Sequence, residues 1–157
     1  MHLVIDCYNL LHETMPPNLA GLDEDRLCRL LASSWGRRAR VTVVCDGRPK
    51  PFALRSPVPE VQLLYSGRRK SADDVILQIV ETESAPRRVT VVSSDRQIQK
   101  AARRRRCKVH DSAQFIRLLA RQPPAPSGSD RGSGGAGRPE ALDEQEVERW
   151  MREFGLD

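Results

Sequence analysis

The 157-residue sequence has no continuous apolar run of the about 18 residues that a membrane-spanning helix needs. Its N-terminus, MHLVIDCYNLL, lacks the basic segment and the small-residue cleavage site of a signal peptide. We therefore expect neither a membrane span nor secretion, and we predict that the protein resides in the cytoplasm.

Cysteine and histidine are too few and too scattered for a zinc site or a disulfide framework. The four cysteines are Cys7, Cys28, Cys45 and Cys107, and none forms a C-x-x-C pair. The three histidines show no ligand spacing either. Zinc sites need closer pairing and disulfides need an oxidising compartment, so we expect the cysteines to be small buried hydrophobic residues.

Several motifs for nucleotides and phosphates are also missing. Neither G-x-x-x-x-G-K-[ST] nor G-x-G-x-x-G occurs, so phosphate-loop and dinucleotide-binding sites have no support. A haloacid-dehalogenase phosphatase would carry a second aspartate two residues after Asp6, but that position is Tyr8. Aromatic residues make up only 4% of the chain, so sequence-specific reading of stacked bases has no support.

Positive charge is abundant, but only in the larger, N-terminal part of the chain. Residues 1–122 carry 22 Lys and Arg against 13 Asp and Glu, a net charge of +9. Residues 123–157 carry 4 against 8, a net charge of −4. A basic domain of this kind favours a polyanionic partner, most simply nucleic acid.

Hydrophobic periodicity alternates between strand and helix along residues 1–122, which we interpret as one domain. Strands are predicted at 2–6, 40–46, 60–66, 87–95 and 107–111, and helices at 23–38, 71–84, 96–106 and 112–122. Such alternation is typical of an α/β fold with a mostly parallel sheet covered by helices on both faces.

The last part of the chain has a different character. Residues 123–142 are rich in Pro, Gly and Ser and are predicted to be a disordered linker. Residues 143–157 regain helical periodicity, with one apolar stripe made of Val147, Trp150, Met151 and Phe154. An isolated helix this short is marginal in water, so the stripe should need a partner surface. That surface could belong to its own domain, but we favour a separate protein or a ribosomal component.

Acidic residues follow three of the predicted strands, namely Asp6, Asp46 and Asp95. The carboxyl ends of parallel strands share one edge of the sheet, where ligands bind in such folds. The helix that begins KSADDV would also start at that edge. Because adjacent helical residues differ by about 100° in direction, either Asp73 or Asp74 can face the site while the other serves the helix start.

Several carboxylates in one cleft repel one another unless a cation lies among them. Oxygen-only ligands suit Mg²⁺ or Mn²⁺, and on a basic protein such a site would assist attack on a phosphodiester. Asn9 could orient a water or an acid without adding charge, or it could simply stabilise the turn. Ser94 could bind phosphate or begin a helix, and the acids themselves could be no more than helix caps.

Four segments, LVIDCYNLLH, VVCDG, KSADDVI and VTVVSSDRQIQKAAR, resemble in order and spacing the motifs of NYN domains, a PIN-like nuclease group, and in particular its bacterial YacP-like branch. The resemblance covers about residues 2–120. It implies a PIN-like, Rossmann-type three-layer domain and divalent-metal-dependent cleavage of RNA. Carried over by motif, the site would comprise Asp6, Asn9, Asp73 and Asp95, with Asp46 and Asp74 as further metal ligands. Cys7 stands where the family usually has Gly, and we expect it to narrow the approach of substrate to the backbone.

Three basic clusters are candidates for contact with the RNA backbone. Arg68, Arg69 and Lys70 directly precede the SADD segment and are the preferred substrate clamp. The clusters at 37–40 and 103–106 are weaker candidates, and the second could merely complement a helix dipole. Tyr8 offers a stacking face for a base.

These features predict a metal-dependent endoribonuclease that hydrolyses RNA phosphodiesters through carboxylate-bound Mg²⁺ or Mn²⁺ and an activated water. Two alternatives remain open. One is a non-catalytic RNA-binding NYN module, and the other is a toxin-type PIN nuclease that a protein partner controls.

Overall fold

The protein contains a five-stranded parallel sheet with strand order β3-β2-β1-β4-β5 in the computed structural model, which describes residues 1–49 and 58–121. The strands are β1 (His2–Asp6), β2 (Arg40–Cys45), β3 (Val61–Tyr65), β4 (Val89–Val92) and β5 (Lys108–His110). The strand order reverses at β1, which pairs with both β2 and β4. Ligands in open parallel sheets bind beyond the carboxyl ends of the strands at such a reversal.

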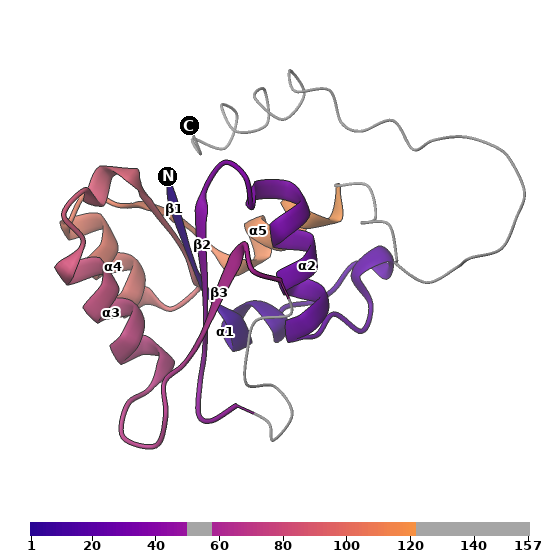
Figure 1. Ribbon diagram of the computed structural model, residues 1–157, viewed down its shortest axis with the longest axis horizontal. Coiled ribbons are helices and arrows are strands. Elements are labelled where there is room, and N and C mark those ends of the chain that lie inside the picture. Colours follow the sequence, from indigo (N-terminus) through magenta and orange to yellow (C-terminus); the bar gives the residue numbers. More distant parts are fainter. Residues whose placement is uncertain (50–57, 122–157) are drawn as a thin grey trace, which may run out of the picture.

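Helices cover both faces of this sheet (Figure 1). The α-helices are α1 (Cys7–Leu11), α2 (Glu24–Trp35), α3 (Ala72–Thr82), α4 (Arg96–Arg104) and α5 (Ser112–Ala120), and two short 3₁₀ helices are η1 (Pro17–Leu19) and η2 (Pro86–Arg88). In Figure 1, α3 and α4 lie on one side of the sheet, and α1, α2 and α5 lie on the other.

Two apolar clusters, one on each face, hold these layers together. The α1, α2 and α5 side buries residues such as Leu3, Ile5 and Leu31 and stacks Trp35 on Phe115 at a ring-centroid distance of 5.5 Å. On the opposite side, Val4, Val44, Ile76, Val80, Val91 and Ile98 form the second cluster. Successive strand residues point to opposite faces, so the central strand β1 contributes to both clusters.

The α/β class, the parallel sheet and every strand and helix predicted within the described residues are confirmed, with shifted ends. One of the two largest shifts is in β4, which was predicted to run to residue 95 but ends at Val92. The chain turns there because the Ser93 hydroxyl accepts the backbone N–H of Asp95 at 3.1 Å. The helix predicted at 23–38 ends at Trp35, next to Gly36.

The short helix α1 was missed, because five residues are too few for helical periodicity to be visible. The predicted linker and C-terminal helix at 123–142 and 143–157 lie outside the described residues. Among the described helices, none is long and apolar enough to cross a membrane.

All four cysteines are buried and free, as predicted. The expectation that Cys7 narrows the approach to the backbone is wrong. Its side chain is fully buried in the core cluster, where it contacts Cys45, and the pKa of its thiol is raised by that contact and by burial. It therefore faces the interior of the domain and not the edge of the sheet.

Candidate active site

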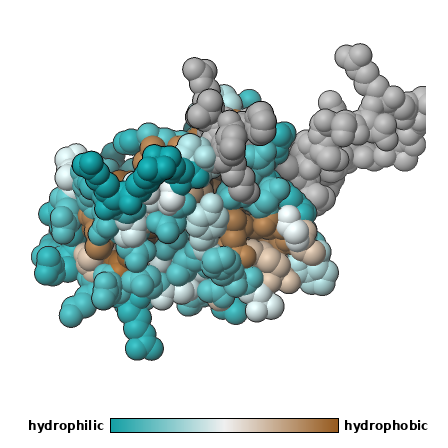
Figure 2. All heavy atoms as spheres, turned by 90° about the horizontal axis from the view of Figure 1, so that it is seen from below, coloured by the Kyte–Doolittle hydropathy of each residue, from teal (hydrophilic) through white to brown (hydrophobic). Residues whose placement is uncertain are grey.

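The carboxyl edge of the sheet gathers four helix starts and the acidic residues singled out in the sequence. The helices α1, α3, α4 and α5 each follow a strand and begin at this edge, so their partly positive N-termini converge there. Figure 2 looks onto this edge from below and shows mainly hydrophilic side chains over α3 and α4.

Asp6 is the most buried acid of the edge, with 5% of its surface exposed. It ends β1 and also caps α1, because its Oδ1 accepts the backbone N–H of Asn9 at 3.4 Å. Its Oδ2 accepts the hydroxyl of Ser93 at 3.2 Å. Burial raises the pKa of Asp6 to about 6; those two hydrogen bonds act against the rise, and the charges of Asp73 and Asp95 add to it.

Ser93 is fully buried and connects two of the acids. Ile5 pairs with Val92 in the sheet, so the residues that follow them, Asp6 and Ser93, leave the strands side by side. Besides donating to Asp6, the Ser93 hydroxyl accepts the backbone N–H of Asp95.

Asp95 is the N-cap of α4 and is only partly exposed. One carboxylate oxygen, Oδ1, accepts the backbone N–H groups of Gln97 and Ile98 at 2.8 and 3.0 Å. The negative charge of Asp95 nevertheless acts on the other acids, since it helps to raise the pKa values of Asp6 and Asp73.

The two adjacent acids of α3 have different surroundings. Asp74 forms a capping box: its Oδ2 accepts the Ser71 N–H at 2.9 Å, and its own N–H donates to the Ser71 hydroxyl at 3.1 Å. These bonds lower the pKa of Asp74. The pKa of Asp73 is raised instead, by partial burial and then by the charges of Asp95, Asp46 and Asp74. The charges of the other acids thus act on Asp73, whereas Asp74 forms part of the cap of the helix.

Asp46 follows β2 and ties two loops of the edge together. Its Oδ1 accepts the backbone N–H of Ala72 at 3.0 Å and the Ser66 hydroxyl at 3.1 Å. The Ser66 hydroxyl in turn accepts the Gly47 N–H at 2.9 Å. Asp46 thus fixes the start of α3, while its charge acts on Asp73.

Asn9 joins α1 to the loop after β4 and to α5. Its Oδ1 accepts the Ser94 N–H at 2.8 Å and the buried Ser112 hydroxyl at 2.7 Å. A backbone N–H can only donate, so the Ser94 contact identifies which side-chain atom is the oxygen. The Ser94 hydroxyl donates to Glu13 at 3.1 Å and accepts the Ser112 N–H at 3.0 Å. Both predicted site residues thus hold the loops of the edge in position.

The residues predicted to contact RNA differ in the bonds that they already make within the fold. Tyr8 donates its hydroxyl hydrogen to Glu24 at 3.1 Å and stacks on His12 at a centroid distance of 6.3 Å. Both the hydroxyl and the ring of Tyr8 therefore already make contacts within the described fold. Arg68, Arg69 and Lys70 are exposed beside the start of α3, and Lys70 donates to Gln78 at 3.0 Å.

The chemical type of the site fits a hard divalent cation. Asp6, Asp73 and Asp95 offer carboxylate oxygens. Burial raises the pKa values of Asp6 and Asp73, and a positive charge among the acids would relieve the repulsion that adds to that rise. Within residues 1–49 and 58–121, no three His, Cys, Asp or Glu side chains are grouped closely enough to hold one ion. Direct ligation by all three aspartates would therefore require side-chain movement.

Sequence reasoning missed three residues of this edge: Ser93, Ser112 and Glu13. A signal existed only for Ser93, because a serine two residues before a helix-capping aspartate is typical of a side-chain turn. Ser112 and Glu13 are joined to Asn9 and Ser94 by long-range contacts that no local pattern indicates.

Comparison with known proteins gives a consistent picture. The model of the YacP-like NYN domain family matches residues 3–152. Two crystal structures are similar in fold: Rae1 (YacP) from Bacillus subtilis, with 20% identity and a TM-score of 0.60 over 76% of this chain and 73% of that chain, and its W164L mutant, with 21% identity and a TM-score of 0.57 over 75% and 74%. No curated protein matches the sequence.

Proposed function

Because the chain belongs to the YacP-like NYN domain family, whose domains are nuclease-like, we propose that it is a metal-dependent endoribonuclease with Asp6, Asp73 and Asp95 at its site. One observation carries this proposal: the three aspartates come from distant parts of the sequence, yet their charges act on one another at the carboxyl edge of the sheet. Aspartates that served only as helix caps would not have to lie close enough to repel one another.

The chemistry supplied by a bound Mg²⁺ or Mn²⁺ ion would be activation of water and neutralisation of phosphate charge. Asp6 is mainly ionised above its pKa of about 6, so at neutral pH its carboxylate can hold the ion. Ser93 and the Asn9 N–H fix the orientation of this carboxylate. Asp73 and Asp95 would complete the ligand set, and Asp46 supports the position of Asp73 through the start of α3.

The substrate in this proposal is RNA, bound through its backbone. Arg68, Arg69 and Lys70 are exposed and directly precede the first turn of α3, which carries Asp73, so they can contact phosphates there. No described residue accepts a hydrogen bond from Nδ2 of Asn9, so this amide is available to a phosphate oxygen or to water. A cytoplasmic location, association with the ribosome and a protein partner for the C-terminal helix all remain predictions.

A non-catalytic RNA-binding module is the second candidate. It is favoured by the capping roles of Asp6 and Asp95 and by the absence of a preformed three-ligand group in the described part of the chain. The toxin-type alternative would need a controlling partner, which nothing in residues 1–49 and 58–121 identifies.

Cleavage of a single-stranded RNA with both ends blocked separates these candidates. We expect internal cuts in Mn²⁺ that EDTA and Asp6→Asn each abolish. Cutting that survives EDTA would contradict the role of a metal, and RNA binding without any cutting would favour the module.

A further inference from the structure

We propose that helix α4 guides the RNA backbone from the candidate site to the opposite edge of the sheet. The surface consists of Arg96, Lys100, Arg103 and Arg104, called here the α4 stripe. The proposal rests on RNA being the ligand of the site, as proposed above, but it concerns binding and does not require cleavage.

The α4 stripe is a continuous row on one side of the helix. Its members are spaced at i, i+4, i+7 and i+8, which places them within a sector of about 100°. All four are exposed. Ile98 and Ala102, on the other side of the helix, are fully buried in the second core cluster. The burial of this apolar side therefore turns the stripe toward solvent.

The charges of the stripe are not used within the described fold. Among the described residues, no ion pair joins any of its four side chains to a carboxylate, unlike His2, which pairs with Glu83. Four adjacent cations repel one another, and a helix end needs only one or two of them to complement its dipole. A polyanion would offset that repulsion.

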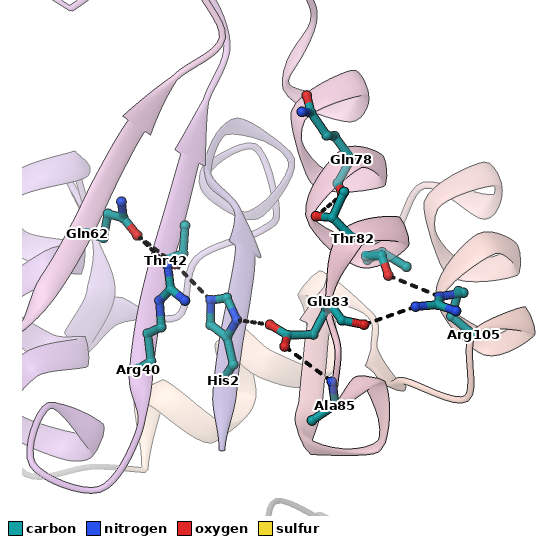
Figure 3. A network of polar contacts seen from close by, with 10 residues as sticks. His2, Arg40, Thr42, Gln62, Gln78, Thr82, Glu83, Ala85 and Arg105 are labelled. Carbon is teal, nitrogen blue, oxygen red and sulfur yellow. Dashed lines mark hydrogen bonds and ion pairs between the residues drawn. The ribbon is translucent and has the colours of Figure 1, made fainter.

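Arg105, which follows the last residue of the stripe, has a structural role instead. Its Nε donates to the carbonyl oxygen of Val80 at 3.3 Å and its Nη2 to that of Glu83 at 3.0 Å, so it fastens the end of α4 to the end of α3 (Figure 3). The stripe makes no bonds of this kind. Arg106, with φ of 65°, turns the chain into β5 and leaves its own side chain exposed where the stripe ends.

The direction of α4 determines which parts of the molecule the stripe connects. The helix begins at its N-cap Asp95, within the candidate site, and its nine residues extend about 13 Å toward the other edge of the sheet. RNA held at the aspartates and running along α4 would meet a cation at every turn. The absence of aromatic residues from α4 predicts backbone contact without base preference.

RNA length therefore provides the test. The full-length chain is kept in EDTA, so that no cleavage is needed, and its affinity is measured for a short RNA of about four nucleotides and for one of about sixteen. The test variant is Arg103→Gln with Arg104→Gln, two members of the stripe distant from the aspartates. The matched control is Arg29→Gln with Arg117→Gln, which removes two exposed arginines of α2 and α5 on the other side of the sheet.

We expect the test variant to lower the salt slope of binding to the long RNA by about 1.4. If the variant and the wild type bind equally at about 1 M salt, the variant should bind roughly 25-fold more weakly than the wild type at about 0.1 M. Binding of the short RNA should be unchanged, and the control should leave both affinities within about threefold. Lys100→Gln with Arg103→Gln provides a second variant if the first is unstable.

Equal affinity of the test variant and the wild type for long RNA would overturn the proposal, since the stripe would then serve another polyanion, such as the acidic residues 123–157. An equal loss for both RNA lengths would also overturn it, because the effect would not follow the length of α4. A length-dependent loss without cleavage in Mn²⁺ would support the stripe and contradict only the proposed enzymatic function.

Discussion

The buried hydroxyl of Ser93 donates a hydrogen bond to Oδ2 of Asp6 over a distance of 3.2 Å. The two residues leave neighbouring parallel strands at the same level, so the sheet itself sets their separation. The same hydroxyl accepts the N–H of Asp95. One small side chain thus holds two acids of the candidate site relative to each other.

Replacing Ser93→Ala should therefore lower the free energy of unfolding by about 1–2 kcal/mol, because a buried carboxylate and a backbone N–H both lose a partner. The RNA cleavage rate should fall while the affinity for RNA stays close to that of the wild type. Chemical denaturation and single-turnover cleavage measure the two effects. Ser33→Ala, which removes only a bond to Leu30 within α2, is the control. A wild-type rate in Ser93→Ala would contradict the positioning role.

Asp6→Asn should stabilise the metal-free protein at pH 8. The ionised carboxylate is disfavoured in the fold, since the pKa of Asp6 rises from 3.8 to about 6, so its removal should gain about 1–2 kcal/mol after allowance for solvent screening. The gain should shrink as the pH falls from 6 toward 4, because the folded wild type then binds the proton more tightly than the unfolded chain does. Denaturation in EDTA at several pH values tests this, with the exposed Asp25→Asn as control. A gain that does not vary with pH would contradict the burial of charge at Asp6.

Asp73→Asn and Asp74→Asn should differ in their effects on Mn²⁺ binding and on the melting temperature. The first should weaken Mn²⁺ binding with little effect on melting temperature, because the charges of the other acids act on Asp73. The second should lower the melting temperature slightly and leave Mn²⁺ binding intact, since Asp74 closes the capping box with Ser71. Calorimetric titration and anomalous scattering from crystals soaked in Mn²⁺ measure the binding. Manganese bound at Asp74 would reverse the assignment.

His2 should make the fold sensitive to mild acid. Burial lowers the pKa of His2, against the effect of its hydrogen bond to Glu83, while Nε2 contacts Thr42 at 2.9 Å (Figure 3). The unfolded chain therefore takes up a proton near pH 6.5 before the folded chain does, and the free energy of unfolding falls as the pH drops below that value. The wild type should lose more stability than His2→Gln between pH 7.5 and 5.5. Parallel stability curves for the two proteins would contradict this account.

The longer strands and helices of this fold could be predicted because burial leaves a recognisable pattern of apolar residues in the sequence. The strand RVTVVC is a short, nearly continuous apolar run rich in β-branched residues, and the helix EDRLCRLLASSW repeats apolar residues at the helical period. Each formed where expected. The short helix α1 left no such pattern. It is stabilised by the capping bond of Asp6, by the burial of Cys7 and Leu10, and by the long-range bonds that Asn9 accepts.

The aspartates of the candidate site could be predicted from the sequence, but the residues that hold them in position could not. Asp6, Asp46 and Asp95 could be expected at one edge because parallel strands all end there. The choice between Asp73 and Asp74 could not be made, since it depends on which carboxylate reaches the Ser71 N–H. Ser112, which is 103 positions from its partner Asn9, becomes visible only once β1 and α5 are brought together.

The most direct test of the central claim compares two helix caps at the same edge. Asp95 caps α4 and Asp111 caps α5, and each accepts the backbone N–H groups of its first turn. Of these two caps, Asp95 is the one whose charge adds to the raised pKa of Asp6. The measurement is the rate of internal RNA cleavage in Mn²⁺ by the wild type, Asp95→Asn and Asp111→Asn, where Asn preserves a good cap in both variants. We predict a loss of about 100-fold or more for Asp95→Asn and a rate within about threefold of the wild type for Asp111→Asn. Equal rates in the two variants would mean that Asp95 is no more than a cap, and would contradict the assignment of this edge as the active site.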